Sequence, residues 1–182
     1  DLGIRDVVVL EREAVAGGIP RHCGHLGFGW QSHRRLWRGP RFAEELRKAA
    51  TGLDVRTATT VIELSRDGQL RVQGSTGISE MKAKHVLIAT GTRETPRAPR
   101  FVGGSRPQGV MNTGALQQHV YIYHNKPFER PVIIGSELVS FSALRTCRHL
   151  GIKPVAMLEE NPRISAQRPG DLIARFAFGV PV

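Results

Sequence analysis

The sequence predicts an α/β fold in which short parallel strands alternate with helices. Two apolar runs, VVVL at residues 7–10 and HVLIA at residues 85–89, are typical of strands buried on both faces of a parallel sheet. A shorter alternating segment, residues 54–58, predicts another strand. The pattern of residues 131–160 is strand, helix, strand, and it predicts one complete βαβ unit.

A helix and a hairpin are predicted between the two apolar runs. Pro40 is typical of a first helical position, and Glu44 and Lys48 stand at the i,i+4 spacing that favours a salt bridge on a helix. The alternating segments 60–64 and 69–73 flank a turn that contains an Asp-Gly step. We therefore expect a small antiparallel insert in the α/β fold.

A proline-rich crossing at residues 95–110 predicts a boundary between two domains. We assign residues 1–100 to the first domain and residues 108–182 to the second. In the second domain, a helix is expected near residues 114–123, followed by the βαβ unit and a further helix at residues 171–178.

The positive charge of the chain does not by itself indicate a nucleic-acid partner. The formal net charge is +10, from 26 Lys and Arg against 16 Asp and Glu. The basic residues are scattered, apart from a dense stretch at residues 34–41, and no zinc-finger, RNP or Arg-rich helical motif accompanies them. We therefore expect no nucleic-acid binding, although nucleic acid stays a third, weaker alternative.

The cysteine content and the hydropathy predict a soluble cytoplasmic protein. Cys23 and Cys147 form neither a disulfide framework nor a zinc-binding pattern. No apolar run approaches the roughly 18 residues of a membrane-spanning helix, and the first residues do not resemble a signal peptide.

An acidic residue, Glu11, follows the first apolar run. In a dinucleotide-binding βαβ unit, a glycine-rich turn binds the pyrophosphate, and an acidic residue about 20 positions later binds the ribose hydroxyls. Counting back from Glu11 leads to a position before Asp1, so we expect the chain to lack the first strand and its phosphate loop. The second domain also stops after its middle strands, so truncation at both ends is expected. Alone, Glu11 also fits an ordinary solvated strand end.

Glu11, the Gly-Gly-Ile-Pro turn at residues 17–20 and the Ile-Ala-Thr-Gly-Thr-Arg run at residues 88–93 together resemble a known family. They are similar to the two-dinucleotide-binding-domain flavoproteins of the pyridine nucleotide-disulfide oxidoreductase-like superfamily. The resemblance implies a Rossmann-like FAD-binding domain with a small antiparallel insert, followed by a second Rossmann-like domain of the NAD(P) type. The cofactor-binding residues that it implies in the first domain are Glu11, Arg12, Gly17, Gly18, Val61, Thr90 and Gly91.

Two longer motifs resemble one branch of this superfamily. They are GGIPRHCGHLGFG at residues 17–29 and TGALQQ at residues 113–118. The branch contains the flavoprotein subunits of hydrogen cyanide synthase, opine oxidase, dye-linked proline dehydrogenase and sarcosine oxidase. The resemblance implies an FAD-dependent oxidoreductase that takes hydride from a C–N bond of an amine or amino acid, with a partner subunit or electron acceptor. The sequence identifies neither the substrate nor a catalytic base.

The second Rossmann-like unit departs from the family's phosphate-binding motif. Gly135 matches its first glycine, but Glu137 and Ser140 stand where the second and third glycines are expected. Glu159 ends the second strand and matches the ribose-binding acidic position. Gly135 and Glu159 are weak candidates for NAD(P) contacts, and we do not expect NAD(P) to bind here, because the Glu137 carboxylate would meet the pyrophosphate with bulk and like charge.

Other interpretations stay open. Cys23 has no second thiol at the spacing of a redox dithiol, so it is either a small packed residue or a single thiol facing the flavin. His22, Cys23 and His25 are too few for a zinc site, and no metal is expected. An alternative function is a non-catalytic assembly subunit in which the degenerate Rossmann unit docks a partner.

Overall fold

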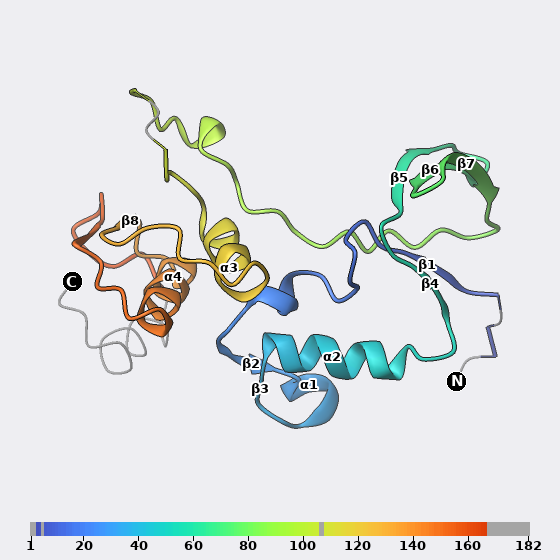
Figure 1. The fold of residues 1–182 in the computed structure, drawn as a ribbon, viewed down its shortest axis with the longest axis horizontal. Coiled ribbons are helices and arrows are strands. Elements are labelled where there is room, and N and C mark those ends of the chain that lie inside the picture. The colour runs from blue at the N-terminus through green and yellow to red at the C-terminus, as the bar shows by residue number, and fades with distance from the viewer. Residues whose placement is uncertain (1–2, 5, 106–107, 167–182) are drawn as a thin grey trace. The chain divides into compact units, whose positions relative to one another are not determined.

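The computed structural model describes residues 3–4, 6–105 and 108–166, which form a mixed α/β chain (Figure 1). The helix predicted at residues 171–178 lies outside these residues. Among the described helices, none has the length and apolar character needed to cross a membrane.

The chain divides into two compact units that are each described separately. Unit 1 contains residues 1–21 and 41–92, and unit 2 contains residues 22–40 and 93–182. The segment 22–40 therefore groups with unit 2, whereas the sequence analysis placed it in the first domain.

Unit 1 has a parallel strand pair, β1 (Val8–Leu10) with β4 (Asp54–Arg56), in which Val9 is opposite Val55. The predicted strand at residues 7–10 is confirmed, but the expectation that it is buried on both faces is wrong. Val8 and Val9 keep 37% and 39% of their surface exposed. The reason is that β1 pairs with β4 alone in the part of the chain that is described.

The antiparallel insert of unit 1 has three strands. The predicted hairpin is confirmed as β5 (Thr60–Leu64) and β6 (Gln69–Gly74), and β7 (Gly77–Lys82), which the sequence analysis missed, pairs with β6. Leu70 and Val72 of β6 are buried. The alternation of β6 therefore gives the insert one apolar face and one polar face.

The predicted strand at residues 85–89 is wrong. The structure has no strand there, and Leu87 and Ile88 are 91% and 70% exposed. A strand needs a neighbour that accepts and donates its ladder of backbone hydrogen bonds. No other described strand pairs with this segment, so its apolar pattern alone does not produce a strand.

The helix predicted from Pro40 is confirmed as α2, Gly39–Ala49. Its predicted ion pair is present, with Lys48 Nζ 3.3 Å from the Glu44 carboxylate. Ala43 of this helix is buried.

Unit 2 contains the predicted βαβ unit. It consists of β8 (Val132–Ile134), α4 (Leu138–His149) and β9 (Ala156–Leu158), and the two strands are parallel with Ile133 opposite Met157. The helix α3 (Thr113–Tyr121) precedes it, close to the predicted residues 114–123.

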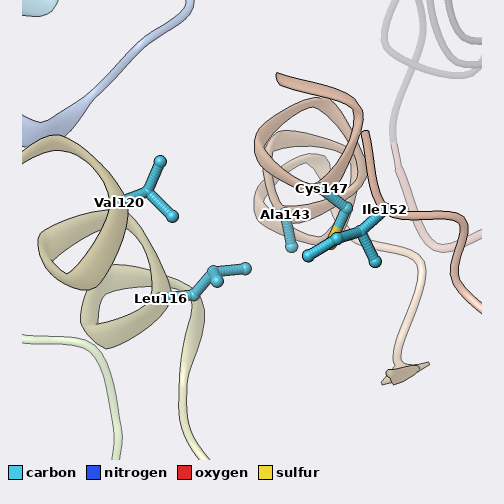
Figure 2. Packing of buried hydrophobic residues seen from close by; sticks show 5 residues of the cluster. All are labelled: Leu116, Val120, Ala143, Cys147 and Ile152. Carbon is cyan, nitrogen blue, oxygen red and sulfur yellow. The ribbon is translucent and has the colours of Figure 1, made fainter. Parts of the chain in front are cut away.

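The core of unit 2 lies between α3 and α4. Figure 2 shows Leu116 and Val120 of α3 facing Ala143 and Cys147 of α4, with Ile152 beside them. A second cluster on α4 packs against the strands and contains Phe141, Leu144, Ile133 and Met157. This apolar contact between helix and sheet fixes the turn between β8 and α4.

Unit 2 also contains a small hairpin that the sequence analysis did not predict. The strands β2 (Leu26–Phe28) and β3 (Trp37–Arg38) are antiparallel, and the short helix α1 (Trp30–His33) lies in the loop between them. Two short 3-10 helices, η1 (Ile19–His22) and η2 (Ala98–Arg100), complete the described elements.

Candidate functional site

Each of the two parallel strand pairs is followed by a glutamate. Glu11 comes directly after β1 in unit 1, and Glu159 comes directly after β9 in unit 2. Ligands of open parallel sheets bind outside the carboxyl ends of the strands. The surroundings of these two carboxylates therefore decide what each unit can bind.

The backbone of Glu11 makes two hydrogen bonds, and only one of its carboxylate oxygens has a hydrogen-bond partner among the described residues. Its N–H donates to the Arg56 carbonyl, and its own carbonyl accepts from the Thr59 N–H, both at 2.9 Å. One carboxylate oxygen, Oε1, accepts from the Glu13 N–H at 2.9 Å. The other oxygen has no partner within the described residues, so it can accept from a ligand hydroxyl. Arg12 turns instead to the Glu13 carboxylate, 2.9 Å away.

The predicted glycine turn of unit 1 packs closely on α2. Gly17 has a φ of 124°, and a Cβ built there would lie 3.0 Å from the Cβ of Ala43. Gly18 has a φ of 56° and accepts a backbone hydrogen bond from Arg21 at 3.1 Å. A Cβ on Gly18 would meet no atom within 4 Å, so the backbone there is open to approach.

The other predicted residues of unit 1 are not brought together with Glu11. Val61 lies in β5 and is 41% exposed. Thr90 and Gly91 follow the segment that is not a strand, and both are exposed. No hydrogen bond in the described part of the chain joins either of them to Glu11. Their roles as cofactor contacts stay predictions.

The turn between β8 and α4 in unit 2 is tied to the end of β9. Gly135, with a φ of 96°, donates its N–H to the Leu158 carbonyl at 2.8 Å. Ser136 is fully buried, and its hydroxyl donates to Glu159 Oε2. The same hydroxyl accepts from the Ser165 N–H at 2.8 Å. The turn is therefore closed by groups of the chain itself.

The Glu137 carboxylate lies over the turn where a pyrophosphate would have to approach. A Cβ built on Gly135 would clash with Glu137 Oε2. Ser140 Oγ donates to that oxygen at 3.3 Å, and Arg100 Nη1 lies 4.0 Å from Oε1. Glu137 is also the N-cap residue of α4. A carboxylate of the chain therefore stands at the helix N-terminus, and the residues present do not fit a dinucleotide phosphate.

Glu159 is saturated with hydrogen-bond donors. Besides Ser136, its carboxylate accepts from the Asn161 N–H at 3.0 Å, from Asn161 Nδ2 at 2.9 Å and from Ser165 Oγ at 3.1 Å. These donors, Ser136 first among them, lower the pKa of Glu159 from 4.5 to about 2. Glu159 was predicted only as a weak candidate for an NAD(P) contact. Its partners Ser136, Asn161 and Ser165 were not predicted, although polar side chains that follow a strand were the available signal.

The TGALQQ motif forms the start of α3, and a carboxylate also caps this helix. Glu94 accepts from the Thr113 N–H at 3.2 Å and from the Gly114 N–H at 2.7 Å. Asn112 is the N-cap residue and accepts from the Ala115 N–H at 2.9 Å. The backbone N–H groups in the first turn of α3 thus donate to side chains of the same unit.

Both cysteines are buried free thiols of unit 2. The two cysteines were predicted to lie in different domains; in the structure the segment 22–40, which contains Cys23, groups with unit 2, and the predicted domain boundary stays a prediction. Cys23 Sγ lies 3.8 Å from Gln117 Oε1, and burial raises the pKa of the Cys23 and Cys147 thiols. Burial therefore disfavours the thiolate that redox or nucleophilic chemistry would need.

No group of three or more His, Cys, Asp or Glu side chains suited to a metal ion occurs within the described ranges. A shallow polar hollow lies on the insert of unit 1, lined by Glu63, Ser65, Gln69, Arg71 and Glu80. Its two carboxylates are already hydrogen-bonded, because Arg71 donates to Glu63 and Gln69 donates to Glu80, each at 2.8 Å.

Comparison with solved structures shows the fold of the chain. The NAD-dependent persulfide reductase from A. fulgidus matches 88% of this chain with a TM-score of 0.54 and 19% sequence identity. The chain spans 30% of the length of that protein. The water-forming NADH oxidase from Lactobacillus brevis matches 87% of this chain and 35% of its own length, with a TM-score of 0.46 and 15% identity.

No protein-family model and no curated protein sequence matches the chain. The likeness to known proteins is thus one of fold, over 30% of the length of the persulfide reductase.

Proposed function

We propose that this chain is part of an FAD-dependent oxidoreductase that acts on an amine or amino acid. The observation that supports the proposal most directly is Glu11, a carboxylate at the carboxyl end of a parallel strand pair with one oxygen free to accept a hydrogen bond. Ribose hydroxyls of a dinucleotide are recognised by an acidic residue in this position.

The residues of unit 1 fit the adenosine side of FAD. Glu11 would accept hydrogen bonds from the ribose hydroxyls, and its carboxylate is oriented for this by the Glu13 N–H. The open backbone at Gly18 would allow a cofactor to approach closely. The described residues of unit 1 contain no glycine turn that leads from a parallel strand into a helix, so they offer no phosphate site of that type.

The proposed role of unit 2 is structural. The persulfide reductase that shares the fold is named as NAD-dependent. In this chain Glu137 stands over the turn that would hold the phosphates, and Glu159 is already hydrogen-bonded. We therefore assign NAD(P) no role in this chain.

The proposed substrate class rests on the two longer motifs at residues 17–29 and 113–118. When bound, FAD would supply the hydride acceptor, and the protein would orient the cofactor and the substrate. An amine or amino acid, rather than a nicotinamide, would then be the hydride donor, because unit 2 does not fit a dinucleotide phosphate.

A titration of the full chain with FAD, followed by backbone amide NMR, tests the proposal. We expect weak, saturable binding with shifts confined to residues 11–18 and none at residues 135–137. Glu11→Ala should weaken binding by about tenfold or more, because a hydrogen bond to a charged group is lost. Glu13→Ala removes the same charge two residues away and should leave the affinity within about twofold.

Two results would contradict the proposal. One is an unchanged affinity for FAD in Glu11→Ala. The other is the absence of any FAD-induced shift, which would favour an assembly subunit without a cofactor. The substrate class is checked separately, by anaerobic bleaching of bound FAD with N-methyl amino acids and with NADPH. We expect bleaching only with the amino acids.

A further inference from the structure

The hairpin of β2, α1 and β3 carries exposed charged and apolar side chains to which the proposed function assigns no role. Between Glu13 and Glu44 the sequence contains five Arg and three His but no Asp or Glu. Arg34 and Arg35 lie in the loop between the two strands and are exposed. Neither has an ion pair with a described carboxylate. The loop therefore presents uncompensated positive charge.

Large apolar side chains are exposed on the same hairpin. Leu26 is 53% exposed, Trp30 is 54% exposed and Leu36 is 60% exposed. The second tryptophan of the hairpin, Trp37, is by contrast 9% exposed. The Trp37 ring is thus packed inside the hairpin, whereas the Trp30 ring lies at its surface.

The hairpin holds this surface in a defined conformation. The His33 ring packs on Trp37 with ring centroids 4.8 Å apart. The Arg34 N–H donates to the Trp30 carbonyl at 3.0 Å, and Arg34 itself has a φ of 53°, which ends α1. The Gly39 N–H donates to the Cys23 carbonyl at 3.0 Å and closes the base of the hairpin. The backbone around α1 (Figure 1) is therefore held by hydrogen bonds and ring packing within the hairpin.

We propose that this hairpin attaches the protein to an anionic phospholipid surface. Tryptophan is favoured at the boundary between acyl chains and headgroups, and arginine binds the headgroup phosphates. Trp30, Leu26 and Leu36 would enter the boundary region, while Arg34 and Arg35 would meet the phosphates. A nucleic acid or an acidic protein would also attract the arginines, but a nucleic acid offers the two leucines no apolar phase.

Vesicle binding by the full chain tests this attachment. The probes are phosphatidylcholine vesicles and vesicles of equal parts phosphatidylcholine and phosphatidylglycerol. Trp30 and Trp37 are the two tryptophans of the sequence, so fluorescence reports directly on the hairpin. We expect co-sedimentation and a blue shift with the anionic vesicles, and neither with phosphatidylcholine alone. In Trp30→Phe the blue shift should disappear, because Trp37 is already buried.

Matched variants separate the hairpin from the overall charge. Arg34→Gln/Arg35→Gln should weaken vesicle binding by about tenfold or more, since each basic residue near an anionic surface contributes about 1 kcal/mol. The control Arg47→Gln/Arg66→Gln makes the same charge change in exposed residues of unit 1 and should have less than half that effect. Leu36→Ser should also weaken binding, whereas Ile78→Ser, at an equally exposed leucine-sized residue of β7, should not.

Three results would overturn the proposal. The first is equal weakening by the two arginine pairs, which would show non-specific attraction. The second is binding to vesicles without any change in Trp30 fluorescence. The third is tighter binding to duplex DNA or to polyglutamate than to the anionic vesicles, which would assign the surface to a nucleic acid or to an acidic protein, respectively. Circular dichroism confirms that each variant is folded, and if Arg34→Gln/Arg35→Gln is unfolded, Arg35→Gln is compared with the single control Arg66→Gln.

Discussion

The two parallel strand pairs of this chain share one local pattern and differ in what surrounds it. In unit 1, the carboxylate of Glu11 has one backbone donor, from Glu13. In unit 2, the carboxylate of Glu159 has donors from Ser136, Asn161 and Ser165. The same acidic residue after the same kind of strand is therefore available for a ligand in one unit and used for structure in the other.

The strand pairs also differ in how they are covered. Phe141 and Leu144 of α4 pack against Ile133 of β8 and Met157 of β9. In unit 1, Val8 and Val9 of β1 stay more than a third exposed. The pair of β8 and β9 is thus covered by a helix, whereas the pair of β1 and β4 is less covered and is followed by a carboxylate with one free oxygen, and this difference motivates the proposal that the cofactor binds at unit 1.

The largest expected effect is on the stability of unit 2. Phe141 is 1% exposed, so Phe141→Ala should lower the free energy of unfolding of this unit by about 3–5 kcal/mol. Val9→Ala in the uncovered pair should cost about 1 kcal/mol or less. Amide hydrogen exchange, measured separately for β8 and for β1, gives the stability of each unit. Similar losses in both would mean that the pairs are equally packed.

A smaller effect is expected from the closed turn. Ser136→Ala removes a buried hydroxyl with two hydrogen bonds and should cost about 1–3 kcal/mol at neutral pH. Ser165→Ala, at an exposed residue of the same cluster, should cost less.

Ser136→Ala should also change how the stability of unit 2 depends on pH in acid. The folded-state pKa of Glu159 is lowered to about 2, so its stabilising contribution is present above its ordinary pKa of 4.5 and is lost as the pH falls from 4.5 toward 2. In Ser136→Ala the pKa should move back toward 4.5, and this acid-dependent loss should shrink. Carboxyl NMR of Glu159 measures the pKa. An unchanged pKa in the variant would show that Ser136 does not hold the carboxylate.

The smallest expected effect is in the insert of unit 1. The pair between Glu63 and Arg71 is about half exposed on both sides, so Glu63→Gln should cost about 0.2–1 kcal/mol and less at high salt. Thermal unfolding at low and high salt measures it. A loss above about 2 kcal/mol would mean that this exposed face contributes to the core.

The sequence predicts those elements whose turn residues and apolar spacing lie within one short stretch of the chain. The βαβ unit of residues 131–160 and the hairpin at β5 and β6 have their own turn and packing signals, and both are present. The run at residues 85–89 has the same apolar signal as a strand but no described neighbour. Apolar pattern identifies a segment that can pair, but pairing depends on another strand.

The candidate site is predictable in its positions but not in its chemistry. Sequence spacing selects Glu11 and Glu159 alike. Only the structure shows that Ser136 and Ser165, 29 residues apart, meet at Glu159. It also shows that Glu137 folds back over Gly135. Such contacts depend on rotamers and on the path of a loop, which a spacing rule does not contain.

We propose that dinucleotide-binding capacity lies in unit 1 and that Glu137 closes the corresponding turn of unit 2. Calorimetric titration with NADPH tests this most directly. The unchanged chain should show no micromolar binding, Glu137→Gly should gain measurable affinity, and the control Glu129→Gly should not. Micromolar affinity for NADPH in the unchanged chain, lost in Gly135→Ala, would contradict the account.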